Sequence, residues 1–176
     1  VQKAARRALT GTLPAAPEVR LRSKMERWAL PLYPRLRAAR ATAVTARLRK
    51  LAPPRVLAAV LRTWFNGWCT KRRFQGNGSC VFGCAFGEDS VAHYMRCLKL
   101  QQHARVRLRL PLSPLMEDRG KSFMLLDSPS QLSDTHLVLR ALLLTAAYRL
   151  HCKLRLSPPL ADEETRQHAL DQAVKE

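Results

Sequence analysis

The sequence predicts a mainly α-helical fold, and three observations support that prediction. Apolar residues recur at helical spacing over residues 56–68, which is typical of a helix with one buried face. A second and more apolar run extends over residues 137–154, where few side chains are polar. Prolines stand at the borders of such segments, as at Pro53 and Pro54, where they end one helix and begin the next.

The first third of the chain is predicted to hold three helices. Residues 1–22 are interrupted by glycine and proline and are expected to be largely irregular. A short helix is expected over residues 23–30 and a longer one over residues 35–51. The next helix is expected to begin at Pro54 and continue through Trp68. Its buried stripe consists of two neighbouring rows with members four residues apart, Val56, Val60, Trp64, Trp68 and Leu57, Leu61, Phe65.

The middle of the chain is predicted to hold one long helix, a helical turn and a short buried run. The helix is expected from Ser90 to about Arg109. Near its end, arginines alternate with apolar residues, a pattern that fits either a short strand or a fraying helix end. A helical turn over residues 113–118 is expected to end at the pair Arg119-Gly120. Residues 123–126 then form a short buried run.

The most apolar helix is expected over residues 133–156, beginning at a serine cap. We predict that it is the central helix of the core and that it packs against residues 56–68. His136 and His151 on this helix are expected to be structural or exposed. A last, acidic helix over residues 162–174 is expected to contact a protein neighbour or the basic part of the chain.

Four residues in one stretch form a metal-ligand pattern. Cys80, Cys84, His93 and Cys97 are spaced as C-x3-C-x8-H-x3-C. Thiolate sulfur and imidazole nitrogen are the ligands that Zn²⁺ takes in structural sites. Glycines around the first pair give the backbone freedom for two sulfurs to converge, and the second pair would share one helix face. The sequence thus predicts a small helical domain with one structural zinc knuckle and a basic, partly irregular N-terminal arm.

Other interpretations of the cysteines remain open at this point. The four residues could be buried free cysteines and a surface histidine, or Cys80 and Cys84 could form a disulfide that leaves Cys97 unpaired. Cys69 and Cys152 are expected to be thiols of the core. Cys69 is close enough to the cluster to replace one of its ligands.

The patterns of several enzyme classes are missing from the sequence. It has no G-x-x-x-x-G-K-[ST] phosphate loop. His93 is followed by Tyr94 and Met95, which do not give the H-x-E of a zinc deaminase. Four protein ligands would also leave no open position on a catalytic zinc. We therefore expect no enzymatic activity and no small-molecule substrate.

The charge is strongly positive and unevenly distributed. The 176 residues carry 31 lysines and arginines against 13 acids, a net charge of +18. Residues 1–74 hold 18 of these cations and two acids, so nearly all the excess lies there. Such an excess predicts a polyanionic partner. No stretch has the length and uncharged character of a membrane-spanning helix. The residues expected to contact RNA are Arg37, Arg40, Arg47, Arg49, Lys50, Arg62, Lys71, Arg72 and Arg73.

This uneven charge also suggests three parts of the chain. Residues 1–52 would be a basic arm with helices, residues 53–157 the helical zinc-binding core, and residues 158–176 an acidic C-terminal helix. The arginine-rich start at Val1 fits the remnant of an organelle-directed precursor, and it fits an RNA-binding arm equally well.

The cysteine-rich stretch also carries a family resemblance. The segments NGWCTKRRFQ and EDSVAHYMRC flank a glycine-broken cysteine pair. They resemble the zinc-binding segment downstream of the polymerase core in non-LTR retrotransposon reverse transcriptases, of the kind found in dinoflagellates and related alveolates. The resemblance is close over residues 61–97 and loose over residues 55–155. The family commonly has two residues between its first two cysteines, where this chain has three. The chain lacks the polymerase motif Tyr-x-Asp-Asp, so the resemblance implies a zinc-bearing nucleic-acid-binding remnant.

Three functions follow as hypotheses. The first is a structural RNA-binding protein of a large ribonucleoprotein, an organellar (mitochondrial) ribosome, in which the chain would contact rRNA and neighbouring proteins. The second is the nucleic-acid-binding C-terminal fragment of a reverse transcriptase. The third is an interaction subunit of a protein complex, with zinc as a staple of its fold. The expected location is mitochondrial, with nuclear or cytoplasmic as alternatives.

Overall fold

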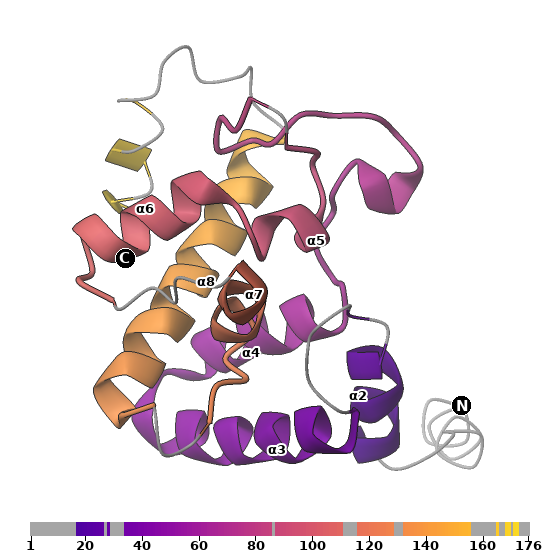
Figure 1. The fold of residues 1–176 in the computed structure, drawn as a ribbon, viewed down its shortest axis with the longest axis vertical. Helices are drawn as coiled ribbons and strands as arrows, with labels where there is room; N and C mark the ends of the chain where they lie inside the picture. Colours follow the sequence, from indigo (N-terminus) through magenta and orange to yellow (C-terminus); the bar gives the residue numbers. More distant parts are fainter. Residues whose placement is uncertain are drawn as a thin grey trace, which may run out of the picture.

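The computed structural model confirms the mainly α-helical fold (Figure 1). It describes residues 17–26, 28, 34–85, 87–110, 116–128, 132–155, 165, 168–169 and 171–172. In chain order the elements are α2 (Pro17–Glu26), α3 (Pro34–Leu51), α4 (Pro54–Trp64), the 3₁₀ turn η1 (Arg72–Phe74), α5 (Val91–Tyr94), α6 (Leu98–Val106), α7 (Met116–Phe123) and α8 (Asp134–Leu154). Within these ranges the β-structure is one isolated antiparallel bridge, between Ser79 and Glu88.

The central pair of helices is the predicted one. Helix α8 crosses α4 and the two pack directly against each other, with α3 running beneath them (Figure 1). Helix α8 begins where Ser133 accepts a hydrogen bond from the backbone N–H of His136 at 3.2 Å. Trp64 is completely buried at the end of α4, and its indole N–H donates to the carbonyl of Met124 at 2.9 Å. This bond ties the segment after α7 to the central pair.

Helix α4 ends four residues earlier than predicted. Asn66 adopts a left-handed backbone conformation with φ of 53°, and the N–H of Gly67 donates to the carbonyl of Arg62. A Cβ atom at Gly67 would lie 2.9 Å from that carbonyl oxygen, so glycine is required for this close turn. Trp68 therefore leaves the helix but remains fully buried. Its indole N–H donates to the hydroxyl of Thr63 at 2.9 Å.

Several predicted boundaries were wrong. Helix α2 begins at Pro17 and ends at Glu26, whereas a helix was expected over residues 23–30. Proline is favourable in the first turn of a helix, where its missing N–H is not needed. Helix α7 runs from Met116 through Gly120 to Phe123, so that glycine does not break it. The buried run over residues 123–126 is confirmed, because all four side chains lie in the core.

The predicted boundary at residue 52 does not coincide with a break in packing. Ala41, Val44 and Leu48 of α3 are buried in the same hydrophobic cluster as Trp64 and the apolar face of α8. Leu21 of α2 joins that cluster as well. The helical part of the expected N-terminal arm is therefore part of the core. Helix α3 itself matches the prediction for residues 35–51 to within one residue.

The predicted C-terminal helix over residues 162–174 lies mostly outside the described residues. Of the described ones, Asp171 lies with its carboxylate 3.2 Å from the guanidinium of Arg107. Ala169 packs against the main core. None of the described helices is both long and apolar enough to cross a membrane.

Candidate metal centre

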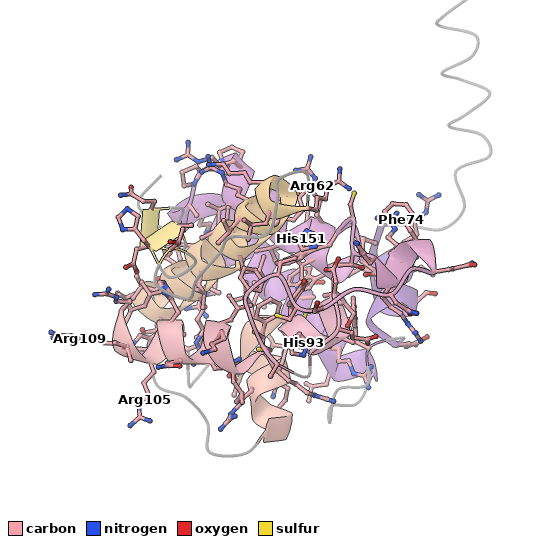
Figure 2. The ribbon with its side chains drawn as sticks, turned by 90° about the horizontal axis from the view of Figure 1, so that it is seen from above. Arg62, Phe74, His93, Arg105, Arg109 and His151 are labelled. Carbon is pink, nitrogen blue, oxygen red and sulfur yellow. The ribbon has the colours of Figure 1, made fainter. Side chains whose placement is uncertain are left out.

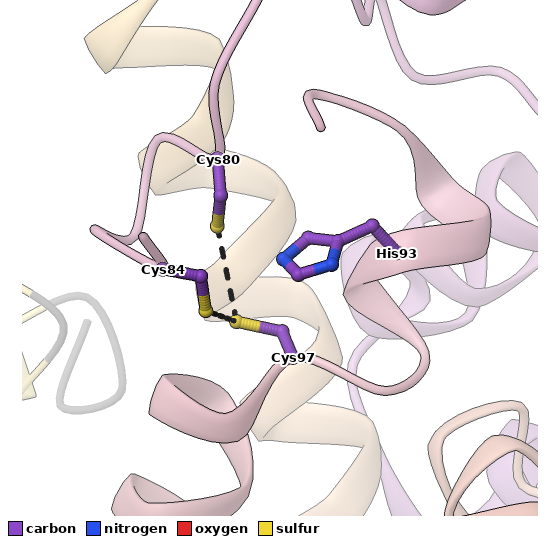
Figure 3. Close-up of side chains that lie close together, drawn as sticks. All are labelled: Cys80, Cys84, His93 and Cys97. Carbon is purple, nitrogen blue, oxygen red and sulfur yellow. Dashed lines mark hydrogen bonds between the residues drawn. The ribbon is translucent and has the colours of Figure 1, made fainter. Parts of the chain in front are cut away.

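The four predicted ligand residues come together in space (Figure 3). One side-chain donor atom from each of Cys80, Cys84, His93 and Cys97 lies within 4.8 Å of all the others. The sulfur of Cys97 is 3.3 Å from that of Cys84 and 3.9 Å from that of Cys80. Three sulfurs and one imidazole form a group that could hold a metal ion. Cys69 lies outside this group, so it replaces none of the four.

A tight turn carries the first two cysteines. The backbone N–H of Gly83 donates to the carbonyl of Cys80 at 3.1 Å, and that of Cys80 donates to the carbonyl of Gly87 at 2.6 Å. Gly83 has φ of 86°, a conformation that glycine adopts without strain. These bonds turn both cysteine side chains toward the same point, as the glycine-rich sequence predicted.

Gly87 leaves the space that the histidine ring occupies. A Cβ atom at this position would lie 2.3 Å from both Cε1 and Nε2 of His93. Two atoms cannot approach so closely, and any larger residue here would displace the ring from the cluster. The need for glycine at position 87 thus comes from the ring of His93.

The second pair of ligands lies on two short helices, not on one long helix as predicted. Helix α5 ends at Tyr94 and α6 begins at Leu98, with Cys97 as its N-cap residue. The ψ angle of Cys97 is 116°, outside the helical range. Arg105 and Val106 are the last residues of α6, so the alternating arginines mark a helix end and not a strand.

Ser90 fixes the start of α5. Its hydroxyl accepts a hydrogen bond from the backbone N–H of His93 at 3.0 Å. This is an N-cap interaction, which satisfies one of the N–H groups that a helix start leaves unpaired. It also places His93 in the first turn, with its ring directed at the sulfurs (Figure 3). Ser90 is thus the N-cap of α5, whereas the neighbouring Asp89 has a different role.

The donor atoms fit a metal ion chemically. The Nε2 atom of His93 is buried and has no hydrogen-bond partner among the described residues. Buried polar atoms are nearly always paired, and this one lies in the same group as the three sulfurs. Metal coordination through Nε2 would satisfy it. Cys80 and Cys97 are buried as well, and Cys84 is half-buried.

Electrostatics in the cluster also favour a cation. A hydrogen bond with Cys97 lowers the pKa of the Cys80 thiol to about 4, against the opposing effect of burial. The same hydrogen bond, together with burial, raises the pKa of Cys97. One sulfur thus ionises at the expense of its neighbour, because adjacent buried thiolates repel each other. A divalent cation would remove that repulsion and allow all three sulfurs to be thiolates.

Asp89 connects the cluster to the rest of the fold. One carboxylate oxygen accepts from the Tyr94 hydroxyl at 2.6 Å and from Nε2 of His151 at 2.9 Å. The other accepts from the backbone N–H of Lys71 at 2.8 Å. These hydrogen bonds hold the pKa of Asp89 below its usual value, although burial alone would raise it. The carboxylate therefore joins α5, α8 and the segment before η1.

The partners of Asp89 could not be predicted from the sequence. Of the two roles expected for His151, structural or exposed, the structural one holds, because the residue is completely buried. Its ring packs on Trp68 with centroids 5.3 Å apart. Because 62 residues separate Asp89 from His151, no local spacing could indicate the pair. Cys69 and Cys152, expected as core thiols, are only half-buried.

The predicted RNA-binding residues fall into two groups. Arg37 is buried and donates to the carbonyl of Trp28 at 3.0 Å. Arg40 donates to the carbonyl of Leu126 at 2.7 Å, and Arg47 donates to that of Leu132 at 2.7 Å. These three cations hold the fold together and are poorly placed for phosphate. The other six are exposed, and they are Arg49, Lys50, Arg62, Lys71, Arg72 and Arg73.

Comparisons with known proteins do not assign the chain to a family. No protein-family model matches it, and neither a curated protein nor a solved structure does.

Proposed function

We propose that the chain is a structural RNA-binding protein of a large ribonucleoprotein, with a zinc ion held by Cys80, Cys84, His93 and Cys97. A mitochondrial ribosome is the assembly we favour, in which the chain would contact rRNA. The resemblance to the zinc segment of non-LTR reverse transcriptases supports a retroelement origin. The strongly basic composition supports a polyanionic partner.

The donor set supports zinc with a structural role. Three cysteine sulfurs and one histidine nitrogen are a common ligand set of tetrahedral structural Zn²⁺. Four protein ligands leave no position for a water or a substrate, so the proposed ion stabilises the fold and catalyses nothing. A chain without enzymatic activity is accordingly part of the proposal.

The observation that carries the RNA proposal is a run of exposed cations next to the segment that holds the four candidate ligands (residues 80–97). Lys71, Arg72 and Arg73 are all exposed, and within the described ranges none of their side chains forms an ion pair. The backbone N–H groups of Lys71 and Arg72 donate to the side chain and the carbonyl of Asp89. Through Asp89, the segment of residues 80–97 would thus hold these cations in a fixed position for RNA phosphates.

The salt dependence of RNA binding tests this proposal. Replacing Lys71, Arg72 and Arg73 together with glutamine should lower the affinity for RNA at low salt. It should also reduce the slope of log K against log salt by about 2, at roughly 0.7 per single-strand phosphate. Fluorescence anisotropy with a labelled RNA at several salt concentrations measures both quantities.

A matched control shows whether the effect depends on where the cations lie or only on the total charge that is removed. Arg96, Arg105 and Arg109 are exposed and lie outside the 71–73 run. Figure 2 shows Arg105 and Arg109 on the side of the molecule opposite Phe74. Replacing Arg96, Arg105 and Arg109 together with glutamine removes the same charge as the variant at residues 71–73. This control should change the slope of log K against log salt less. Equal slopes for the two triple variants would contradict the proposed location.

Nuclease treatment of the native particle tests the assembly. An rRNA-binding protein should be released when the RNA is digested. A protein that remains attached to its neighbours after complete digestion would favour the interaction-subunit hypothesis.

A further inference from the structure

An exposed aromatic ring lies within the basic run. Phe74 is the last residue of η1 and is 65% exposed, the largest value among the exposed large hydrophobic residues that the structure describes. It belongs to a segment that protrudes from the helices, which we call the Phe74 loop (residues 71–77). Figure 2 shows Phe74 at the edge of the molecule. Single exposed hydrophobic side chains are common on protein surfaces, so a role for Phe74 has to follow from its neighbours and not from its exposure alone.

The Phe74 loop is well ordered by its own hydrogen bonds. The backbone N–H of Phe74 donates to the carbonyl of Lys71 at 3.0 Å, and that of Gly76 donates to the same carbonyl at 2.9 Å. Gln75 closes the turn in a left-handed conformation with φ of 60°. At its base, the N–H of Lys71 is bound by Asp89. The ring is therefore held outward by a fixed backbone and is not a collapsed side chain of a loose segment.

The ring follows a basic run in the sequence, and one of these cations lies over it in space. Lys71, Arg72 and Arg73 precede it directly, and the loop contains no acid. The guanidinium of Arg73 lies 6.0 Å from the ring centroid of Phe74. Arginine beside an aromatic face is the arrangement that proteins use to stack bases while contacting phosphate. The neighbouring residues Gln75 and Asn77 add polar groups that could bond to a base edge.

These features favour one kind of partner. A membrane-binding segment needs an apolar face of many residues, and Phe74 is the one apolar side chain of the Phe74 loop. A duplex hides the faces of its bases, whereas an unpaired base offers a face that can stack on an aromatic ring. A lone ring among arginines thus fits an unpaired base flanked by phosphates.

We propose that Phe74 is a stacking platform for an unpaired base of a single-stranded nucleic acid, with Lys71, Arg72 and Arg73 on the adjoining phosphates. This deepens the proposed RNA-binding function and rests on it. The chemical class of ligand is a single strand or a loop, not a continuous duplex.

The test compares substitutions of Phe74 that keep or remove the aromatic face. Phe74→Leu keeps an apolar side chain and removes the π-face, while Phe74→Tyr keeps that face. The Leu variant should bind a single-stranded oligonucleotide roughly 5- to 150-fold more weakly, which corresponds to the loss of one base stack. The Tyr variant should bind like the unchanged protein. The salt slope should be the same for all three, because no charge is altered.

A second measurement locates the base directly. A single strand carrying 5-bromouridine should form a photocrosslink at Phe74, identified by mass spectrometry. Because Phe74 is exposed, its variants are expected to fold, and equal metal content with equal circular dichroism verifies this.

The outcomes separate the two proposals. If the Leu variant binds single strands as tightly as the unchanged protein, stacking is overturned while RNA binding by the cations stands. If the unchanged protein binds no RNA, both proposals fall. If Phe74→Leu weakens binding to anionic lipid vesicles and not to single strands, the ring is a membrane contact and the stacking proposal is overturned.

Discussion

Two sets of arginines in this chain carry the same charge but differ in their contacts and in their exposure to solvent. Arg37, Arg40 and Arg47 on α3 donate to backbone carbonyls of other segments. Arg72 and Arg73 of the Phe74 loop have exposed side chains, and of these two Arg73 makes a long hydrogen bond of 3.4 Å to the carbonyl of Trp68. The difference shows that a cation's surroundings, and not its charge, decide whether it holds the fold or is available to a ligand. Both sets lie within the basic first 74 residues, so net charge alone could not separate them.

Loss of the proposed metal should have the largest effect, and it should be larger for one set than for the other. Cys97→Ser removes a buried candidate ligand and should destabilise the protein by about 4 kcal/mol or more if the site holds zinc, since a structural zinc contributes on the order of 10 kcal/mol. Because Cys97 and α3 belong to the same core cluster, cleavage by trypsin should rise at both sets. We expect the rise to be larger after Lys71, Arg72 and Arg73 than after Arg40 and Arg47, as mapped by mass spectrometry.

The control for that variant is Cys69→Ser. Cys69 is half-buried and outside the cluster, so its change should be within about 1 kcal/mol. Equal effects of the two serine substitutions, or no metal in the unchanged protein, would contradict a structural metal site.

The next effect concerns Asp89, which attaches the Phe74 loop to the core. Asp89→Asn should lower the free energy of unfolding by about 2–4 kcal/mol at neutral pH, because it removes a buried charge bound by three donors. The pKa of Asp89 is lowered in the folded state, so its ionisation stabilises the fold above the unfolded pKa of about 3.9. That contribution is lost as the pH falls through the lower, folded value.

Denaturant unfolding at several pH values measures this effect. The difference between Asp89→Asn and the unchanged protein should therefore shrink below about pH 4. A difference that is constant across the acidic range would mean that ionised Asp89 does not hold the loop.

A smaller effect is expected for the arginines of α3. Arg40→Met keeps the long apolar stem and leaves the carbonyl of Leu126 without its donor, at a cost of about 1–2 kcal/mol. RNA affinity should not change. Arg49→Met on the same helix is the control, since Arg49 is exposed. If Arg40→Met reduced the salt slope of RNA binding without lowering stability, the contrast between the two sets would be wrong.

The smallest effect on stability is expected for the loop cations. Replacing Lys71, Arg72 and Arg73 with glutamine should change the free energy of unfolding by about 0.5 kcal/mol or less, as measured by urea unfolding. A loss comparable to that of Arg40→Met would show that these cations also serve the fold.

The parts of the fold that depend on local pattern could be predicted. The pairing of α4 with α8 followed from two apolar stripes, and α3 followed from its flanking prolines. The four ligands followed from residue type and spacing, because few other arrangements of cysteine and histidine bring four donors together. These signals lie within about 20 residues of sequence, where periodicity and spacing act.

The remaining features depend on contacts between distant segments. The break between α5 and α6 follows from the turn that Cys97 makes to reach the cluster, which helix propensity does not indicate. The roles of Arg40 and Arg47 depend on carbonyls 86 and 85 residues away. Phe74 had a recognisable signal, an aromatic residue directly after three cations, but its exposure could not be predicted from the sequence.

The carboxylate of Asp89 has a consequence for how the proposed metal and the proposed RNA partner would affect each other. It binds the backbone of the Phe74 loop on one side and side chains of α5 and α8 on the other. If the metal orders α5 and thereby the loop, metal occupancy strengthens RNA binding by some factor. Thermodynamic reciprocity then requires RNA to strengthen metal binding by the same factor. Within an assembled particle the ion would be harder to remove than from the free protein, and chain and ion would be retained together.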